Sequence, residues 1–160
     1  MKNKLGLSDI KLLFVERKIV NTKLNLLDEQ FISDKDIFDL EYIKQIHLFL
    51  FSDLYYEEQL NLRGLSQEEL KYINVLLNSI KEICINGYDC KEILIETLIK
   101  LWELQIFKDG NTRTLLGYLS ILNQAFILNL DIDFNKEIKS RPSALYKNIV
   151  VNQKQLTKSK

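Results

Sequence analysis

The chain has 160 residues, and its 22 Lys and Arg residues balance its 22 Asp and Glu residues, so its formal net charge at pH 7 is zero. Proteins that mainly bind nucleic acid or an anionic membrane need a surplus of positive charge, and this balance argues against both classes. Gly and Pro number only 5 and 1, whereas average usage would give about 19 in total, so a fold of many strands would lack turn residues.

Apolar residues recur at three- and four-residue spacing along most of the chain, which predicts helices. Ser8 is expected to cap a first helix that runs to about Leu27. This helix carries on one side the apolar residues Ile10, Leu13 and Phe14. A second helix is expected to begin after Ser33 and to carry apolar residues to Leu54.

The clearest helix start is at Ser66, where Glu69 stands three residues later in the pattern of a capping box. The third helix is expected to end at Gly87, and to bury Leu70, Ile73, Leu76, Leu77 and Ile80. A fourth helix is predicted from about Asp89 to Ile106.

Residues 114–130 contain no charged side chain. This stretch is short for a membrane span and contains amides that would be costly in lipid, so we expect a central helix surrounded by others. Asp131 and Asp133 are then capping residues, and Pro142 opens or kinks a last helix. The sequence predicts an all-α bundle of about six helices in one domain, residues 1–151, with a flexible polar tail at 152–160.

The rare residues limit the chemistry. His47 is the one histidine, and its apolar neighbours on a helix predict a packed core residue. Cys84 and Cys90 have no metal-site spacing, so we expect free thiols and no metal cluster. Met1–Leu7 shows no secretion signal, which makes the cytoplasm the expected location and a membrane partner unexpected.

The segment between the fourth and central helices admits two interpretations. Asp109-Gly110-Asn111 is an ordinary turn sequence, with Asn111 as the N-cap of the next helix. The same segment also has the parts of an anion site. Gly110 permits close backbone approach, Arg113 adds a charged fork, and Asp109 is a suitable Mg²⁺ ligand beside a phosphate.

Two stretches resemble the Fic family. Residues 102–114 resemble its active-site motif His-x-Phe-x-(Asp/Glu)-Gly-Asn-(Gly/Thr)-Arg, in the subtype with Thr after Asn. Residues 46–55 resemble an earlier helix of the family, Ile-His-x-x-Leu-Phe-x-Asp-Ile-Tyr. With the order of helices, the resemblance covers roughly residues 31–148, and two motifs in the right order are less prone to chance than one.

The resemblance implies an all-α domain that transfers AMP from ATP to a hydroxyl group of a target protein. Asp109 would hold Mg²⁺, and Phe107 would fix the loop in the core. The phosphates of the nucleotide would be cradled by Gly110, Asn111, Thr112 and Arg113.

Three departures from the family are visible. Gln105 stands where the family has the histidine that accepts the proton of the target hydroxyl, and Leu116 replaces a second arginine. Loss of a positioned general base costs about 10²- to 10⁴-fold in rate. Residues 56–64 leave little room for the hairpin that docks the target. No glutamate stands in the family's self-inhibitory pattern (Ser/Thr)-x-x-x-Glu-(Gly/Asn), so no internal brake is expected.

Three hypotheses therefore remain. The first is a Fic-type adenylyltransferase impaired or inactivated by Gln105. The second is a Fic-fold pseudoenzyme that binds a nucleotide or a partner protein without transfer. The third is an unrelated helical interaction module. The expected ligands are ATP with Mg²⁺ and a target or regulatory protein, and a nucleic acid is not expected.

Overall fold

The computed structural model describes residues 2–86, 91–128 and 133–140. All regular structure in these residues is helical, which confirms the predicted all-α class. The elements in chain order are α1 (Asp9–Gln30), α2 (Leu40–Phe51), the short 3₁₀ helix η1 (Glu57–Leu60), α3 (Gln67–Asn86), α4 (Lys91–Glu103), α5 (Asn111–Phe126) and α6 (Phe134–Lys139). None of the helices within these residues is long and apolar enough to cross a membrane.

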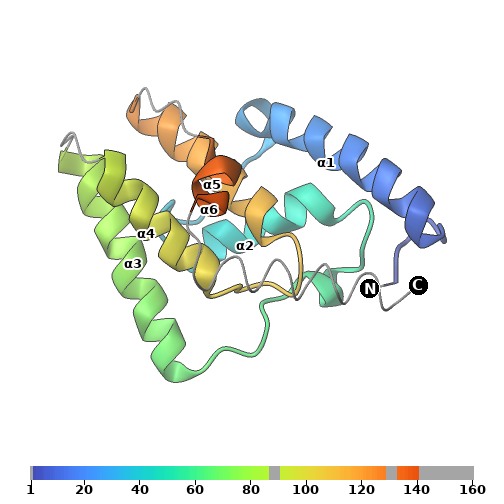
Figure 1. The fold of residues 1–160 in the computed structure, drawn as a ribbon, viewed down its shortest axis with the longest axis horizontal. Coiled ribbons are helices and arrows are strands. Elements are labelled where there is room, and N and C mark those ends of the chain that lie inside the picture. The colour runs from blue at the N-terminus through green and yellow to red at the C-terminus, as the bar shows by residue number, and fades with distance from the viewer. Residues whose placement is uncertain (1, 87–90, 129–132, 141–160) are drawn as a thin grey trace.

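Helix α5 is the centre of the bundle, as the absence of charge over residues 114–130 predicts. It packs against α1, α2, α3 and α4, while α3 and α4 lie side by side (Figure 1). Gly117 lets two neighbouring helices approach α5 closely, because a Cβ atom there would lie 3.1 Å from Leu27 and 3.3 Å from Ile46. Tyr118 is fully buried, and its hydroxyl donates to the Ile37 carbonyl at 2.8 Å.

The capping box of α3 is confirmed. The Glu69 amide donates to Ser66 Oγ at 3.1 Å, and the Ser66 amide donates to the Glu69 carboxylate at 3.1 Å. The predicted inward residues Ile73, Leu76, Leu77 and Ile80 are buried, and Leu70 is half-buried. Local polar chemistry was sufficient here because every partner lies within one turn.

Several predicted boundaries are wrong, and α2 and α5 end at Phe51 and Phe126, earlier than the sequence predicts. Helix α2 begins at Leu40 rather than after Ser33, because Asp36 accepts the Phe38 amide at 2.8 Å and Asp39 accepts the Glu41 amide at 3.1 Å. These short side chains hold the preceding backbone in a turn. Helix α4 ends at Glu103 rather than Ile106, because the backbone turns left-handed at Gln105.

Helix α1 agrees with the prediction in part. Ser8 is its N-cap but makes no side-chain capping bond, and the helix continues to Gln30. Its core face is formed by Glu16, Val20 and Leu27. The apolar residues expected on one side, Ile10, Leu13 and Phe14, are exposed.

Asp133 caps α6 by accepting the Lys136 amide at 3.1 Å, as predicted. Cys84 is buried and free, and burial raises the pKa of its thiol to about 11. Several sequence predictions lie outside the described residues, namely those for Gly87, Asp89, Cys90, Leu130, Asp131, Pro142 and the tail at 152–160.

Candidate functional site

The loop between α4 and α5 is fixed at Gly110, which is the N-cap of α5. Its φ angle is +79°, and its carbonyl accepts the Thr114 amide at 3.0 Å. A Cβ atom at this position would lie 2.6 Å from the Phe51 ring and 3.1 Å from His47 Cε1. The position therefore requires glycine for two reasons, its left-handed backbone and the packing against α2.

The buried side chain of Asn111 holds the loop by hydrogen bonds. Asn111 is the first helical residue and not the predicted N-cap, and its side chain is buried. Its carboxamide accepts the Phe107 amide at 2.9 Å and donates to the Phe107 carbonyl at 2.8 Å and to Gln105 Oε1 at 3.2 Å. The side chain of Asn111 is therefore committed to the loop, and only its backbone N–H remains for an anion.

Gln105 lies at the end of α4 with a φ angle of +46°, which is uncommon for a residue other than glycine. Its Nε2 donates to the Trp102 carbonyl at 2.8 Å, while its Oε1 accepts from Asn111. The side chain of Gln105 therefore joins the last turn of α4 to the start of α5. An amide has no basic lone pair with which to accept a proton.

Arg63 holds this loop from a distant segment. Its guanidinium donates to the Leu104 carbonyl at 2.7 Å and to the Gln105 carbonyl at 2.8 Å, and its amide donates to the Ile106 carbonyl at 2.9 Å. It also forms an ion pair with Glu69 at 2.5 Å, which lowers the pKa of that carboxyl to about 2. Because the backbone of Gln105 is left-handed, α4 ends at Glu103, and Arg63 binds the carbonyls of the residues that follow.

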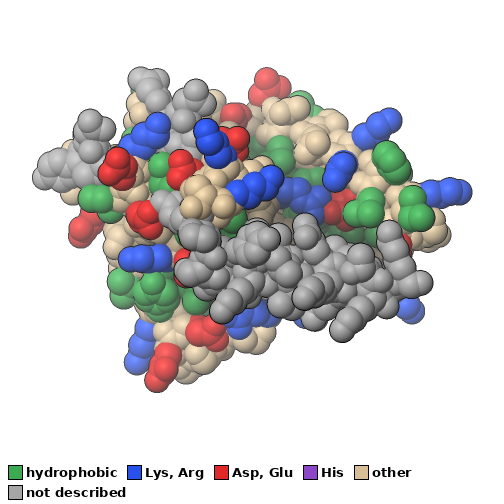
Figure 2. All heavy atoms as spheres, viewed as in Figure 1, with side chains coloured by type: hydrophobic (Ala, Val, Ile, Leu, Met, Phe, Trp, Pro, Cys, Tyr) green, Lys and Arg blue, Asp and Glu red, His purple; other side chains and the backbone are tan. Residues whose placement is uncertain are grey.

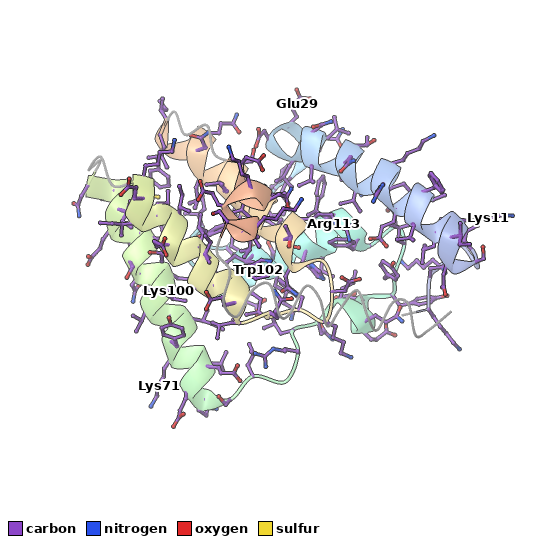
Figure 3. The ribbon with its side chains drawn as sticks, in the orientation of Figure 1. Lys11, Glu29, Lys71, Lys100, Trp102 and Arg113 are labelled. Atoms are coloured by element: carbon purple, nitrogen blue, oxygen red, sulfur yellow. The ribbon has the colours of Figure 1, made fainter. Side chains whose placement is uncertain are left out.

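Arg113 extends from the first turn of α5 toward α1 (Figure 3). Its Nη2 lies 2.5 Å from the carboxylate of Glu16, and its guanidinium lies 4.7 Å over the Phe51 ring. The other oxygen of Glu16 accepts a hydrogen bond from the Tyr55 hydroxyl. Burial and this hydrogen bond raise the pKa of Tyr55. The positive charge predicted to face a phosphate is thus already paired with an internal acid.

His47 is the packed core residue that the sequence predicts. It is buried, its Nδ1 lies 2.7 Å from Thr114 Oγ1, and its ring stacks on Phe107 with centroids 3.8 Å apart. Burial and the nearby charge of Arg113 lower its pKa to about 3. The ring is neutral at physiological pH and links α2 to both sides of the loop.

Solvent reaches one side of the loop. Asp109 is exposed, and its Oδ1 accepts the Gly110 amide at 2.8 Å, which leaves its second oxygen available to a cation. Thr112 is half-buried, and its hydroxyl accepts Trp102 Nε1–H at 2.8 Å. Within the described residues, no acceptor binds the backbone N–H groups of Thr112 and Arg113. These two N–H groups are the donors that an approaching anion would meet.

Two cavities lie away from this loop. One of about 420 Å³ is formed mainly by residues 30–34 and 45–52, and one of about 160 Å³ lies among α1, α2 and α5. No residue of the loop 104–113 lines either one. A ligand at the loop would therefore bind on its exposed surface and not inside one of these cavities.

The predicted site residues do lie together, but two of their partners, Glu16 and Arg63, were not predicted and carry no recognisable local signal. Tyr55 ends the second motif at residues 46–55, but its hydrogen bond to Glu16 was not predicted. Glu16 does not match the self-inhibitory pattern given above. That pattern has Ser or Thr four residues before the glutamate and Gly or Asn after it, where this chain has Leu12 and Arg17. No protein-family model matches the chain, and no curated protein matches it significantly.

The packing at Gly110 predicts a large effect of a single methyl group. Gly110→Ala is expected to lower the free energy of unfolding by about 2–4 kcal/mol, because it combines left-handed strain with overpacking against Phe51. Gly64→Ala is the matched control, since a Cβ there meets nothing within 4 Å. Urea unfolding measures both variants, and equal stability of the two would contradict the close packing at Gly110.

The buried neutral histidine predicts a pH dependence of stability. Because the pKa of His47 is lowered from 6.5 to about 3 on folding, the unfolded chain binds more protons between these values, and stability falls as pH falls through 6.5. We expect a loss of about 2 kcal/mol between pH 7 and pH 5. His47→Asn, which keeps a polar group near Nδ1, should remove most of this slope. If the pH dependence of the free energy of unfolding were unchanged in His47→Asn, it would come from other titratable groups.

Proposed function

We propose that this protein is a Fic-type domain that binds a magnesium nucleotide at the loop 105–113 and transfers AMP very slowly or not at all. The observation that carries the proposal is the start of α5. There the unengaged N–H groups of Thr112 and Arg113, both half-buried residues, and the exposed acid Asp109 lie on either side of the buried, left-handed Gly110.

The phosphate contacts would come from three kinds of group. The N-terminal end of a buried 16-residue helix favours an anion through its backbone N–H groups. Arg113 can add a charged hydrogen bond, and Asp109 can hold Mg²⁺ that is also bound to phosphate. Asp109 is a single carboxylate ligand, so Mg²⁺ would be held jointly with the nucleotide.

Weak transfer follows from Gln105. In AMP transfer, a hydroxyl oxygen bonds to the α-phosphorus, the bond from that phosphorus to pyrophosphate breaks, and the hydroxyl proton needs an acceptor. Gln105 cannot accept it, and its amide is already engaged with Trp102 and Asn111. His47 is buried with a pKa of about 3, so it is not available in its place.

Glu16 sets the strength of binding. Its carboxylate holds Arg113, so a phosphate that uses this arginine must replace or share that ion pair. A hydrogen bond to a charged group contributes about 1.5–3 kcal/mol, which corresponds to about tenfold or more in affinity. Nucleotide binding to the chain as it stands is therefore expected to be weak.

A second candidate function is a helical interaction module without nucleotide. Two observations favour it: Arg113 is already neutralised by Glu16, and neither cavity described above is lined by the loop. In that case the Arg113 network only joins α1 to α5. The two functions differ in whether removal of the Glu16 charge creates affinity for phosphate.

Thermal unfolding with ATP and Mg²⁺ separates them. Ligand at about five times its Kd adds about 1 kcal/mol and raises the Tm of a chain of this size by about 2–4 °C. We expect this rise at a lower nucleotide concentration for Glu16→Gln than for the unchanged chain, and no rise for Arg113→Ala. Lys100→Ala, which removes one exposed positive charge on α4, is the matched control and should keep the rise.

Two outcomes would contradict the proposal. Absence of any rise in both the unchanged chain and Glu16→Gln at millimolar nucleotide would leave the interaction module as the better account. If Arg113→Ala and Lys100→Ala both lost the rise in Tm to the same extent, the nucleotide would be attracted by positive charge in general and not bound at the loop. Mg²⁺ alone and nucleotide with EDTA are the ligand controls. Each should raise the Tm less than ATP and Mg²⁺ together.

A second test addresses transfer. Gln105→His restores a group that can accept a proton, and histidine tolerates a positive φ angle better than most residues. AMP incorporation from α-labelled ATP into lysate protein should rise at least tenfold. The double variant Gln105→His with Arg113→Ala should lose that gain. Nucleotide binding without any gain would favour the pseudoenzyme form of the proposal.

A further inference from the structure

Helix α1 has apolar side chains on two faces. Its core face carries Val20 and Leu27, both buried. On the other side, Ile10, Leu13 and Phe14 are 64%, 57% and 70% exposed. These three follow the i, i+3, i+4 spacing, so they form one contiguous surface and not scattered single residues.

Basic side chains flank this apolar surface. Lys11, Arg17 and Lys18 are exposed, and no ion pair in the described residues engages them. Figure 2 shows hydrophobic side chains next to Lys and Arg side chains over the first half of α1, and Figure 3 shows Lys11 pointing outward at the start of the helix. The α1 outer face is defined here as these six residues, 10, 11, 13, 14, 17 and 18.

We propose that the α1 outer face binds an acidic amphipathic helix of a partner protein. Three apolar side chains at this spacing match the anchors by which one helix contacts another. Uncompensated positive charges at the rim select a partner with Asp or Glu beside its apolar stripe, and accelerate its association. This inference uses none of the residues of the loop 105–113, so it is independent of the proposed nucleotide site.

Charge distinguishes this partner from other occupants. A second copy of the chain would bring the same basic residues against each other. Residues 141–160 of the chain carry no Asp or Glu and are themselves basic, with positive residues at 141, 147, 154, 158 and 160. Binding to anionic lipid is typical of clusters of about 4–8 Lys and Arg residues, and this face carries three.

The experiment uses the full chain and a labelled synthetic peptide. The peptide is an 18-residue helix with Leu at i, i+3, i+4 and i+7 spacing and Glu beside this stripe, and its counterpart has Lys at every Glu position. Fluorescence anisotropy should show at least tenfold tighter binding of the Glu peptide, weakening as salt is raised from 50 to 500 mM. Equal affinity for the two peptides, or no binding of either, would overturn the proposal.

Two variants locate the binding. Phe14→Glu should weaken binding of the Glu peptide at least tenfold, whereas Val75→Glu, at an apolar position of α3 that is 59% exposed, should not. Lys11→Glu with Lys18→Glu should reverse the preference in favour of the Lys peptide. Because these positions are exposed, the variants should fold normally. The unfolding midpoint of each variant should match that of the unchanged chain.

Other occupants have distinct signatures, each of which would overturn the proposal. A dimer of the unchanged chain in sedimentation, lost in Phe14→Glu, would assign the face to a second copy. Binding to phosphatidylserine vesicles without binding of the Glu peptide would assign it to a lipid surface. A fall of several degrees in the Tm of Phe14→Glu would show that other residues of the chain already cover it.

Discussion

The first turn of α5 has no room for a side chain at Gly110, and the geometry of the loop before it depends on this constraint. The Phe51 ring and His47 lie against the glycine from α2, while the same histidine stacks on Phe107 and contacts Thr114. One contact region therefore ties the core helix α2 to both ends of the loop. The orientation of the N–H groups at Thr112 and Arg113 is set by that packing.

Two polar networks also hold the loop and the start of α5 in place. Arg63 and Asn111 satisfy the backbone groups of the loop, which allows an irregular segment to lie between two buried helices. Glu16 binds both Tyr55 and Arg113, and so connects α1, α5 and the segment that follows α2 through a carboxylate that is itself buried. Stability and any ligand affinity are thereby coupled, because the arginine that would meet a phosphate also holds α1 in place.

Much of the fold could be predicted from local chemistry. The capping box at Ser66 involves partners three residues apart, and the absence of charge over residues 114–130 was sufficient to place α5 at the centre. The cluster of Asp109, Gly110 and Arg113 was also visible, since these residues are close in sequence. His47 could be assigned to the core from its apolar helical neighbours.

The remaining features depend on residues far apart in the chain. Glu16 and Arg113 are 97 positions apart, and nothing in either local sequence predicts their ion pair. The carbonyls that follow α4 are bound by Arg63, 41 positions before Leu104, and no local pattern predicts this contact. On α1, apolar periodicity alone cannot tell which of two apolar stripes faces the core, so the exposed position of Phe14 emerged only from the structure.

The central claim is the proposal that the turn at the start of α5 binds the phosphates of a nucleotide. Amide NMR spectra during titration with ATP and Mg²⁺ test it most directly, because the backbone N–H groups are the proposed ligands. The account predicts that the largest shifts occur at Gly110, Thr112 and Arg113, with smaller changes at Glu16 and Tyr55. Shifts confined to residues 30–52, or saturation without any change at Thr112 and Arg113, would contradict it.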